Sequence, residues 1–395
     1  MNNGARCPPV SISSTQLPEE PLLNPLVNRS IGAPQMNYRS RDRVARALAH
    51  QEPDRIPFDA IGCGVAAESA ELPADYREYV HSGEFRYLTF QPPAGDRRRF
   101  GPFLPGLPEG AKISYWGVGR VPITTPDGFH AGHTYWHPLA AVDTVQALRR
   151  YPFPKPNECP AKEVLTAAVA TAKAQGFTVV GAMSQTILET AYVMRGIEQL
   201  FVDFYERPDY VEALFAILGE WRRFQARVLA TAGVDVLRLG DDIATQESLM
   251  VGLDTYRHFI RPHHAATIAA ARAVNPAIAV LYHSDGNLTP LLPDLVSIGV
   301  TAINPVQAEC MDLRRVKRDF GRDLTLWGCM PVQSIYARGT AVDVLAHVRF
   351  LMEEIAPGGG FVAQFYNMLH TPRIRENVQT FFAAFHRMHR NEDHA

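Results

Sequence analysis

The sequence predicts an α/β protein that folds as a closed (β/α)8 barrel. Short apolar runs with strand character alternate with longer stretches of helical periodicity along most of the chain. Residues 278–282 form one such run and end on His283; a helical stretch follows, and the next run ends on Asn304. This strand–helix–strand order is typical of parallel sheets, and the carboxyl ends of the strands form the active-site face of a closed barrel.

The beginning of the chain leads into the barrel. Residues 1–36 are rich in Pro, Asn and Ser and lack periodicity, so we expect a mobile or draped tail. The barrel domain is expected to cover residues 37–390. Ser40 is expected to cap a helix over residues 41–50.

A long insertion is expected after the second strand. Residues 56–61 and 85–90 are expected as the two opening strands. Residues 91–160 are aromatic and rich in Gly and Pro, and a stretch of this length is more typical of an ordered insertion than of a bare loop. The insertion either folds over the barrel mouth or uses its aromatic residues for its own packing.

From residue 161 the alternation of helix and strand is regular. Helical patterns cover residues 161–175, 256–274, 288–298 and 371–388, and a long helical region breaks near Pro208. Thr340 is expected to cap the helix between the last two strands. Further strands, which bring the number to eight, are expected over residues 177–183, 234–240, 278–282, 300–304, 324–328 and 360–365.

The bulk properties exclude several classes of protein. A net charge of -2 gives no electrostatic reason for a nucleic-acid or membrane-surface partner. No apolar stretch reaches the ~18 residues of a membrane span, and the first residues lack a secretory signal. The 5 cysteines are scattered, which argues against a disulfide scaffold, so we expect a cytoplasmic protein with a small-molecule substrate.

Two adjacent carboxylates, Asp241 and Asp242, follow the strand that ends at Gly240. At least one should project into the barrel mouth, where partial desolvation suits an acid, a base or a group that orients the substrate. Asp241 is favoured as catalytic and Asp242 as substrate-binding. The alternative is that one of them caps the next helix or pairs with Arg238.

His283 and Asp285 stand two residues apart where the chain leaves strand geometry, so both can point into one cavity. We expect both to be catalytic, and with a third group such as Cys310 they could bind a metal such as zinc. Alternatively His283 only orients Asp285. Cys310 and Cys329 follow strand ends, where a thiolate can bind a soft metal, although a lone cysteine is more often an apolar filler.

Other polar residues also follow strand ends. Their amides and carboxylates could bind a polar ligand, and loop hydrogen bonding or helix capping is the competing explanation. These expected substrate-binding residues are Gln185, Glu189, Asn304 and Gln307. His263 and His264 lie in a helical pattern and are expected to be packing or surface residues.

Short motifs make the chain resemble the uroporphyrinogen decarboxylase superfamily from about residue 37 to residue 389. In chain order they are Arg41-Asp42-Arg43, Pro53-Asp54-Arg55-Ile56-Pro57, Trp136-His137-Pro138-Leu139, Tyr151-Pro152-Phe153-Pro154, Arg195-Gly196-Ile197-Glu198, Gly240-Asp241-Asp242, His283-Ser284-Asp285-Gly286-Asn287, Asn304-Pro305-Val306-Gln307 and Pro357-Gly358-Gly359-Gly360. The resemblance implies a TIM barrel, often dimeric, with a deep cleft at the carboxyl ends of the strands.

Two branches of that superfamily imply different activities. Uroporphyrinogen decarboxylases use no cofactor and bind the substrate carboxylates with an Arg-Gln-Ala-Gly-Arg motif; the matching residues 56–62 contain no arginine. The other branch contains methyltransferases that work with corrinoid proteins and bind zinc through a His-x-Cys pair and a later Cys. His283 keeps the first ligand, but Asp285 replaces the Cys and residues 361–364 supply no later one, so thiol-activating zinc is not expected.

The leading hypothesis is methyl transfer between a corrinoid carrier protein and a small acceptor or methylated substrate, by a homodimer. In it Asp241 and Asp285 polarise the ligand, and His283 donates a hydrogen bond or binds a metal. The alternatives are a cofactor-independent decarboxylase or lyase, and a non-catalytic ligand-binding barrel.

Overall fold

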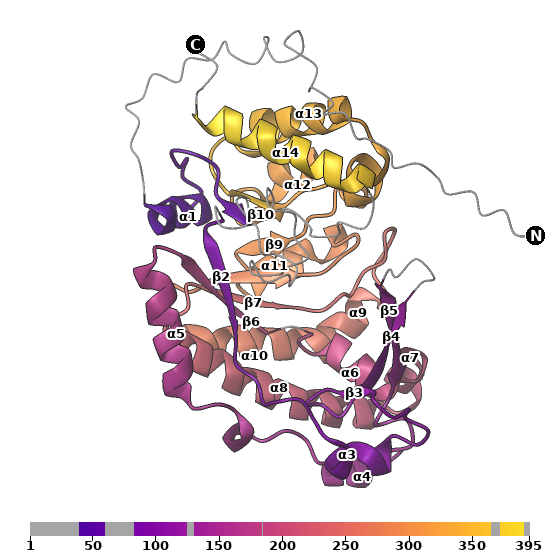
Figure 1. Cartoon of the computed structure of the whole chain (residues 1–395). Coiled ribbons are helices and arrows are strands. Elements are labelled where there is room, and N and C mark those ends of the chain that lie inside the picture. Colours follow the sequence, from indigo (N-terminus) through magenta and orange to yellow (C-terminus); the bar gives the residue numbers. More distant parts are fainter. Residues whose placement is uncertain (1–38, 60–82, 125–129, 184, 365–371, 391–395) are drawn as a thin grey trace, which may run out of the picture.

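The computed structural model describes residues 39–59, 83–124, 130–183, 185–364 and 372–390, and they form the predicted α/β barrel (Figure 1). Eight parallel strands lie in the order β1-β11-β10-β9-β8-β7-β6-β2. From β2 to β11 each barrel strand lies beside the next one in the chain, and β1 lies beside β11. Each of the eight predicted strands is confirmed. They are β1 (Phe58–Asp59), β2 (Phe85–Thr89), β6 (Thr178–Ala182), β7 (Val236–Gly240), β8 (Ala279–His283), β9 (Ala302–Asn304), β10 (Thr325–Gly328) and β11 (Phe361–Gln364).

The ring closes between β1 and β2, the two ends of this order. The backbone N–H of Glu84, just before β2, donates to the carbonyl of Phe58 at 3.0 Å. The Glu84 carboxylate returns the contact by accepting from the Phe58 N–H at 2.9 Å and from Arg43 and Arg55. A buried ion-pair network therefore fastens the seam of the barrel.

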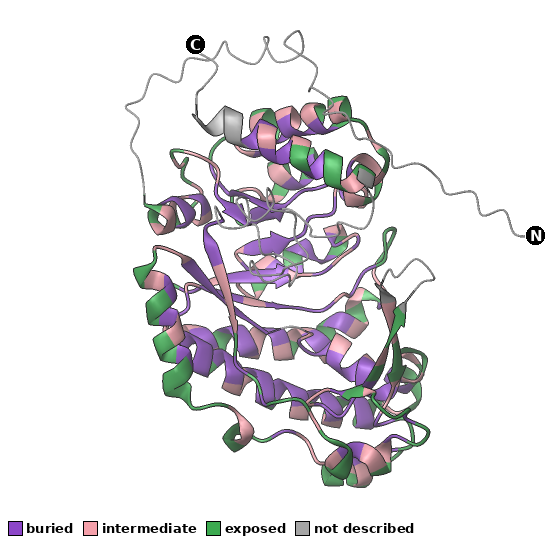
Figure 2. Cartoon of the chain, viewed as in Figure 1, coloured by how far each residue is buried: buried purple, intermediate pink, exposed green. Residues whose placement is uncertain are grey.

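Helices surround the ring, with buried faces toward the strands and exposed faces outward (Figure 2). The longest, α8, begins at Pro208, where the sequence predicted a break, because proline suits the first turn of a helix. The helices of at least six residues are α1 (Ser40–Leu48), α4 (Val145–Arg150), α5 (Lys162–Ala174), α6 (Leu188–Arg195), α7 (Ile197–Glu206), α8 (Pro208–Ala232), α10 (Arg261–Arg272), α11 (Leu292–Ser297), α12 (Leu313–Phe320), α13 (Ala341–Phe350) and α14 (Pro372–Arg390).

Of the two helix caps predicted from the sequence, one is confirmed and one was wrong. Thr340 caps α13 in a capping box with Asp343, as predicted. The cap predicted at Ser40 was wrong: α1 begins at Ser40 itself, and its N-cap, Arg39, makes no side-chain cap. Arg43 and Val44 of α1 are drawn into contacts with the barrel instead, so packing, and not a cap, fixes the start of this helix.

Two layers of inward side chains fill the barrel. Near the amino ends, an apolar cluster joins Phe85, Val180, Val236, Leu281 and Trp327. Side chains alternate along a strand, so the inward residues two positions further on form the next layer. That layer is polar, and it places Tyr87, Arg238, His283 and Gln364 near the carboxyl ends of the strands.

The insertion between β2 and β6 is ordered where it is described. It holds a three-stranded antiparallel sheet, β3 (Lys112–Ile113), β4 (Gly119–Thr124) and β5 (His130–Trp136). Its aromatic residues pack on one another and on α8: the Tyr151 hydroxyl donates to the Trp116 carbonyl at 2.6 Å, and Trp116 meets Trp221 edge to face. These aromatic residues therefore serve packing on the outer helices.

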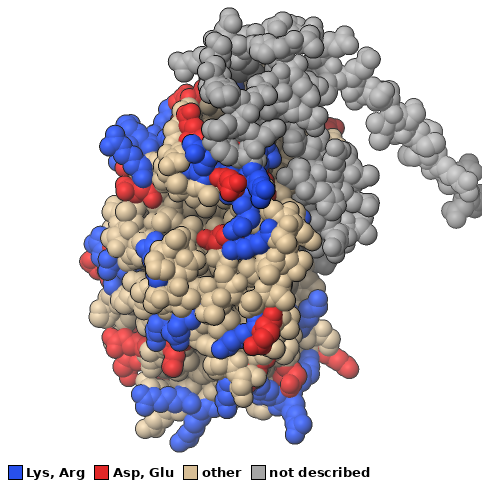
Figure 3. All heavy atoms as spheres, turned by 90° about the vertical axis from the view of Figure 1, so that its left-hand side faces the viewer, with Lys and Arg blue, Asp and Glu red and all other residues tan. Residues whose placement is uncertain are grey.

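The charged side chains form no field of one sign on the face shown in Figure 3. Lysines and arginines alternate there with acidic residues, in keeping with the net charge of -2. Among the helices of the described ranges, none is both long enough and apolar enough to cross a membrane.

Candidate active site

Three polar side chains from two neighbouring strand ends meet above the barrel. Asp242 follows β7, His283 ends β8 and Asp285 comes two residues later. One ligand atom from each lies within 4.8 Å of the others. Asp242 and Asp285 are also joined through the backbone, because Asp242 Oδ1 accepts from the Asp285 N–H at 2.9 Å.

A glycine makes this approach possible. Gly240 has a φ of 149°, and a Cβ there would overlap the backbone of His283. Any other residue would push β7 and β8 apart at the point where Asp242 and His283 meet.

Asp241 and Asp242 are adjacent but face different surroundings. Asp241 is fully buried: its carboxylate accepts from the N–H groups of Ile187 and Glu189 at 2.9 and 3.0 Å and from His264 Nε2 at 2.8 Å. It thus fixes the start of α6 and lines neither of the two cavities described below. Asp242 is the carboxylate that lines one of these cavities. His264, expected as a packing or surface residue, is buried and bonds to Asp241.

Glu189 is held beside Asp242 by this arrangement. A cavity of about 200 Å³ is lined by Gln185, Glu189, Asp242 and His283, together with Arg238. Burial, helped by the nearby Asp242 and Asp241 carboxylates, raises the pKa of Glu189 to about 8. At neutral pH Glu189 is therefore mostly protonated and can donate a proton into the cavity.

Burial also raises the pKa of Asp242, and the neighbouring Asp241 adds to the effect. Gln185 donates to Glu189 at 3.3 Å, and its φ of 51° places it in the left-handed region. Val306 and Cys329, which follow β9 and β10, share this unfavourable backbone conformation. Such strain of about 1–3 kcal/mol per residue is typical of functional sites.

The tautomer of His283 is set by a chain of hydrogen bonds. Asn304 Nδ2 donates to the Trp327 carbonyl at 2.8 Å, so Asn304 Oδ1 must be the atom that accepts from His283 Nδ1 at 2.7 Å. Nε2 of His283 then carries the lone pair. Among the described residues, Nε2 has no hydrogen-bond partner, which suits a metal ligand or a base.

The same series of hydrogen bonds continues across the barrel to Asp59. Asn304 Nδ2 also donates to Gln364 Oε1, and Gln364 Nε2 donates to Asp59 Oδ2 at 2.9 Å. Trp327 Nε1 and the Tyr87 hydroxyl donate to the same Asp59 oxygen. No sequence pattern indicated this support for His283, although Asp59 and Gln364 both end strands.

His283 is neutral in this setting. Burial lowers its pKa to about 3, and the nearby Arg238 guanidinium contributes. Asn304, expected to bind substrate, is buried and orients His283 instead.

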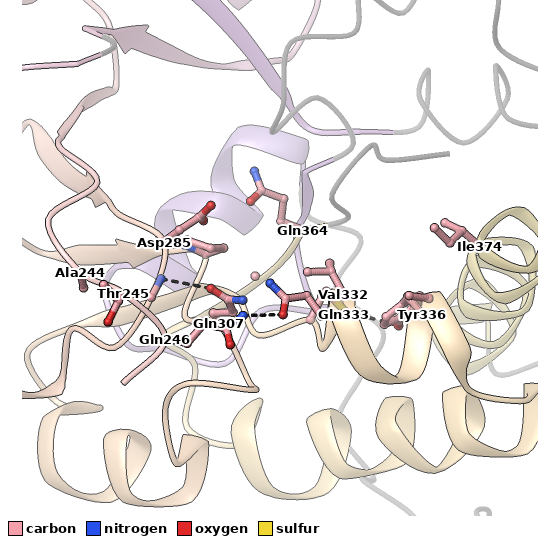
Figure 4. A pocket seen from close by; sticks show the side chains of 15 residues that line it. Ala244, Thr245, Gln246, Asp285, Gln307, Val332, Gln333, Tyr336, Gln364 and Ile374 are labelled. Carbon is pink, nitrogen blue, oxygen red and sulfur yellow. Dashed lines mark hydrogen bonds between the residues drawn. The ribbon is translucent and has the colours of Figure 1, made fainter. Parts of the chain in front are cut away.

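A second cavity of about 440 Å³ is lined by Asp285 (Figure 4). Gln307 lines it, as expected for a residue that binds a ligand, and accepts from the Gly286 N–H at 3.1 Å. Gln364 lines the same cavity and also belongs to the hydrogen-bond network that orients His283.

The residues present fit a divalent cation bound by nitrogen and oxygen. One imidazole and two carboxylates match the number of protein ligands in catalytic metal sites. Cys310 is not part of this cluster, and burial raises the pKa of its thiol. Cys329 is fully buried. Among the described residues the cluster therefore contains no thiolate. Its nitrogen and oxygen ligands suit harder metal ions than the ligands of a His-x-Cys site do.

The comparisons with known proteins agree with this architecture. The family model described as uroporphyrinogen decarboxylase (URO-D) matches residues 135–388. A solved methyltransferase from Methanosarcina mazei superposes with a TM-score of 0.58 at 17% identity, covering 89% of this chain and 99% of that one. A search of curated protein sequences finds no match.

Proposed function

Because the chain belongs to the uroporphyrinogen decarboxylase (URO-D) family, we propose that it is an enzyme that moves a methyl group between a small methylated substrate and a corrinoid carrier protein. Its resemblance in fold to a methyltransferase supports this choice. So does the absence of arginine from residues 56–62, where a porphyrinogen decarboxylase would bind its substrate carboxylates.

The observation that carries the proposal is that a protonated acid, Glu189, lines the same small cavity as Asp242 and His283, two members of the metal-type cluster. When a methyl group leaves a heteroatom, the bonding electrons stay on that atom, which then needs a proton. Glu189 is protonated at neutral pH and faces the cavity, so it can supply that proton. Asp242, His283 and Asp285 would hold a divalent cation, which polarises a bound heteroatom.

The corrinoid is expected to come with a partner. A corrinoid ring is larger than either of the two cavities at the site, so a carrier would present it at the barrel mouth. When bound it supplies the acceptor of the methyl group. The residues of this chain then position the substrate and exclude water.

Protonated Glu189 also suits the alternative of cofactor-independent decarboxylation, in which it would protonate the carbanion left by CO2. The two reactions give different products. An assay of CO2 release with the same substrates therefore separates them.

The test uses the purified full-length protein with a reduced corrinoid carrier and a panel of methoxy, methylthio and methylamino compounds. We expect the cobalt absorption spectrum to change with at least one compound. Glu189→Gln and Asp242→Asn should slow that change by ~100-fold or more, and Glu163→Gln, on the outer helix α5, should not. No spectral change with any compound would contradict the proposal.

A further inference from the structure

Arg238 is a cation inside the barrel whose N–H donors the proposed reaction does not use. Val236, two residues earlier on β7, belongs to the apolar cluster inside the ring, so Arg238 also points inward. Its side chain lines the 200 Å³ cavity together with Glu189, Asp242 and His283. On one side its strand neighbour is Ala182, whose small side chain leaves room beside the guanidinium.

Within the described ranges, Arg238 makes no hydrogen bond and no ion pair with the protein. The other arginines inside the fold behave differently. Arg195 bonds to Asp203 and to main-chain carbonyls, Arg222 bonds to Thr190 and Gln225, and Arg43 bonds to two carboxylates. A guanidinium has five N–H donors, and leaving them unused in a half-buried cavity is costly.

The acidic groups of the cavity do not take up these donors. Asp242 accepts from the Asp285 N–H, and Glu189 accepts from Gln185, Tyr192 and the Asp242 N–H. No carboxylate of the described residues lies within the 4.0 Å of an ion pair with Arg238. A planar donor group therefore faces the space in which a substrate would lie.

We infer that Arg238 binds a carboxylate of the substrate, so that the transferred methyl group belongs to a small organic acid. Arginine matches a carboxylate with two parallel hydrogen bonds. A single negative charge suits the site better than a phosphate dianion, because the Asp242 carboxylate already lines the same cavity. The inference rests on the proposed function in taking this cavity as the substrate site, and it defines the substrate class.

The experiment measures binding, not turnover. The full-length protein is titrated calorimetrically with methoxyacetate and with methoxyacetamide, its neutral counterpart of the same shape, at constant ionic strength. We expect the wild type to bind the carboxylate at least about ten-fold more tightly than the amide. Arg238→Met should remove that preference while leaving amide binding in place.

Arg322→Met is the matched control, because Arg322 is exposed in the turn before β10, at the opposite end of the barrel; it should keep the preference. If Arg238→Met does not fold, Arg238→Lys decides, because lysine cannot form the paired contact and should give an intermediate preference. No preference in the wild type, or one unchanged in the Arg238 variants, would overturn the inference.

The outcome is independent of methyl transfer. An Arg238-dependent preference without any change in the cobalt spectrum would refute the proposed function and leave the carboxylate site standing. A change in the cobalt spectrum without that preference would support the proposed function and refute the carboxylate site.

Discussion

Glu189 shows how burial of one residue sets the chemistry of the site. With a pKa near 8, it loses its proton as the pH rises through that value. Methyl transfer should therefore decline as the pH rises through the pKa of Glu189, which a cation bound by Asp242 would lower from this value. In Glu189→Gln this decline should be absent and the rate at neutral pH lower by ~100-fold or more, as initial rates across pH 6–10 would reveal. If the rate of the variant declined at alkaline pH as the wild-type rate does, the proton would come from a group other than Glu189.

The same residue should make stability depend on pH. The folded protein binds the Glu189 proton up to about pH 8, whereas the unfolded chain releases it near the ordinary glutamate pKa of 4.5. Stability is therefore lost as the pH rises between these values. In free energy of unfolding, Glu189→Gln should match the wild type at about pH 4 and exceed it by roughly 2 kcal/mol at pH 9. Urea denaturation of chelator-treated protein measures this free energy of unfolding. A difference between the two proteins that stays the same from pH 4 to pH 9 would contradict the prediction.

Asn304 should act through His283. Removing its side chain frees the imidazole to rotate and to change tautomer, so Asn304→Ala should weaken divalent-metal binding by ~10–100-fold. Calorimetric titration with Zn²⁺ and Mn²⁺ measures this affinity. Asn275→Ala, in the loop before β8, is the control. Equal affinities in both variants would show that the hydrogen-bonded chain to Asp59 does not serve a metal site.

At the scale of elements, the close approach of β7 and β8 depends on Gly240. A methyl group there would overlap the His283 backbone, and the φ of 149° is unfavourable for alanine. Gly240→Ala should lower the free energy of unfolding by ~3 kcal/mol or more. Gly252→Ala should change it by less than about 1 kcal/mol, because that position has open space and an ordinary φ of -62°. Chemical denaturation of both variants would show whether the strand approach is as tight as described.

At the scale of the whole molecule, the barrel depends on its seam. Glu84 bonds to Phe58 on β1 and to Arg43 on α1, and its own carbonyl accepts from Thr178 on β6. Glu84→Ala would leave Arg43 buried with one partner fewer, and should cost roughly 3–5 kcal/mol. Glu109→Ala, exposed in the insertion, should cost less than ~0.5 kcal/mol. A small effect in both variants, measured by denaturant unfolding, would show that the ring holds without this network.

The sequence alone determined the ring of strands and the residues that stand at its mouth. Strand and helix patterns depend on local periodicity, and Asp242, His283 and Asp285 follow strand ends directly. Parallel strands bring their carboxyl ends together whatever the details of packing. The meeting of His283 and Asp285 with a carboxylate that follows β7 was therefore predictable, although the sequence favoured Asp241 over Asp242.

Only the tertiary structure decided which way each side chain points and what it contacts. Asp241 turns to α6 and His264 while Asp242 turns to the cavity, because the direction of each depends on how α6 and α10 pack outside the ring. The support of His283 reaches Asp59 through Gln364, which lies 305 residues from Asp59 in the chain. Local pattern carries no information about such distant partners. The protonation of Glu189 follows from the closed barrel, because burial and neighbouring charge exist only once the ring has formed. The same holds for Arg238, which lines the cavity without a hydrogen bond to any of the described residues.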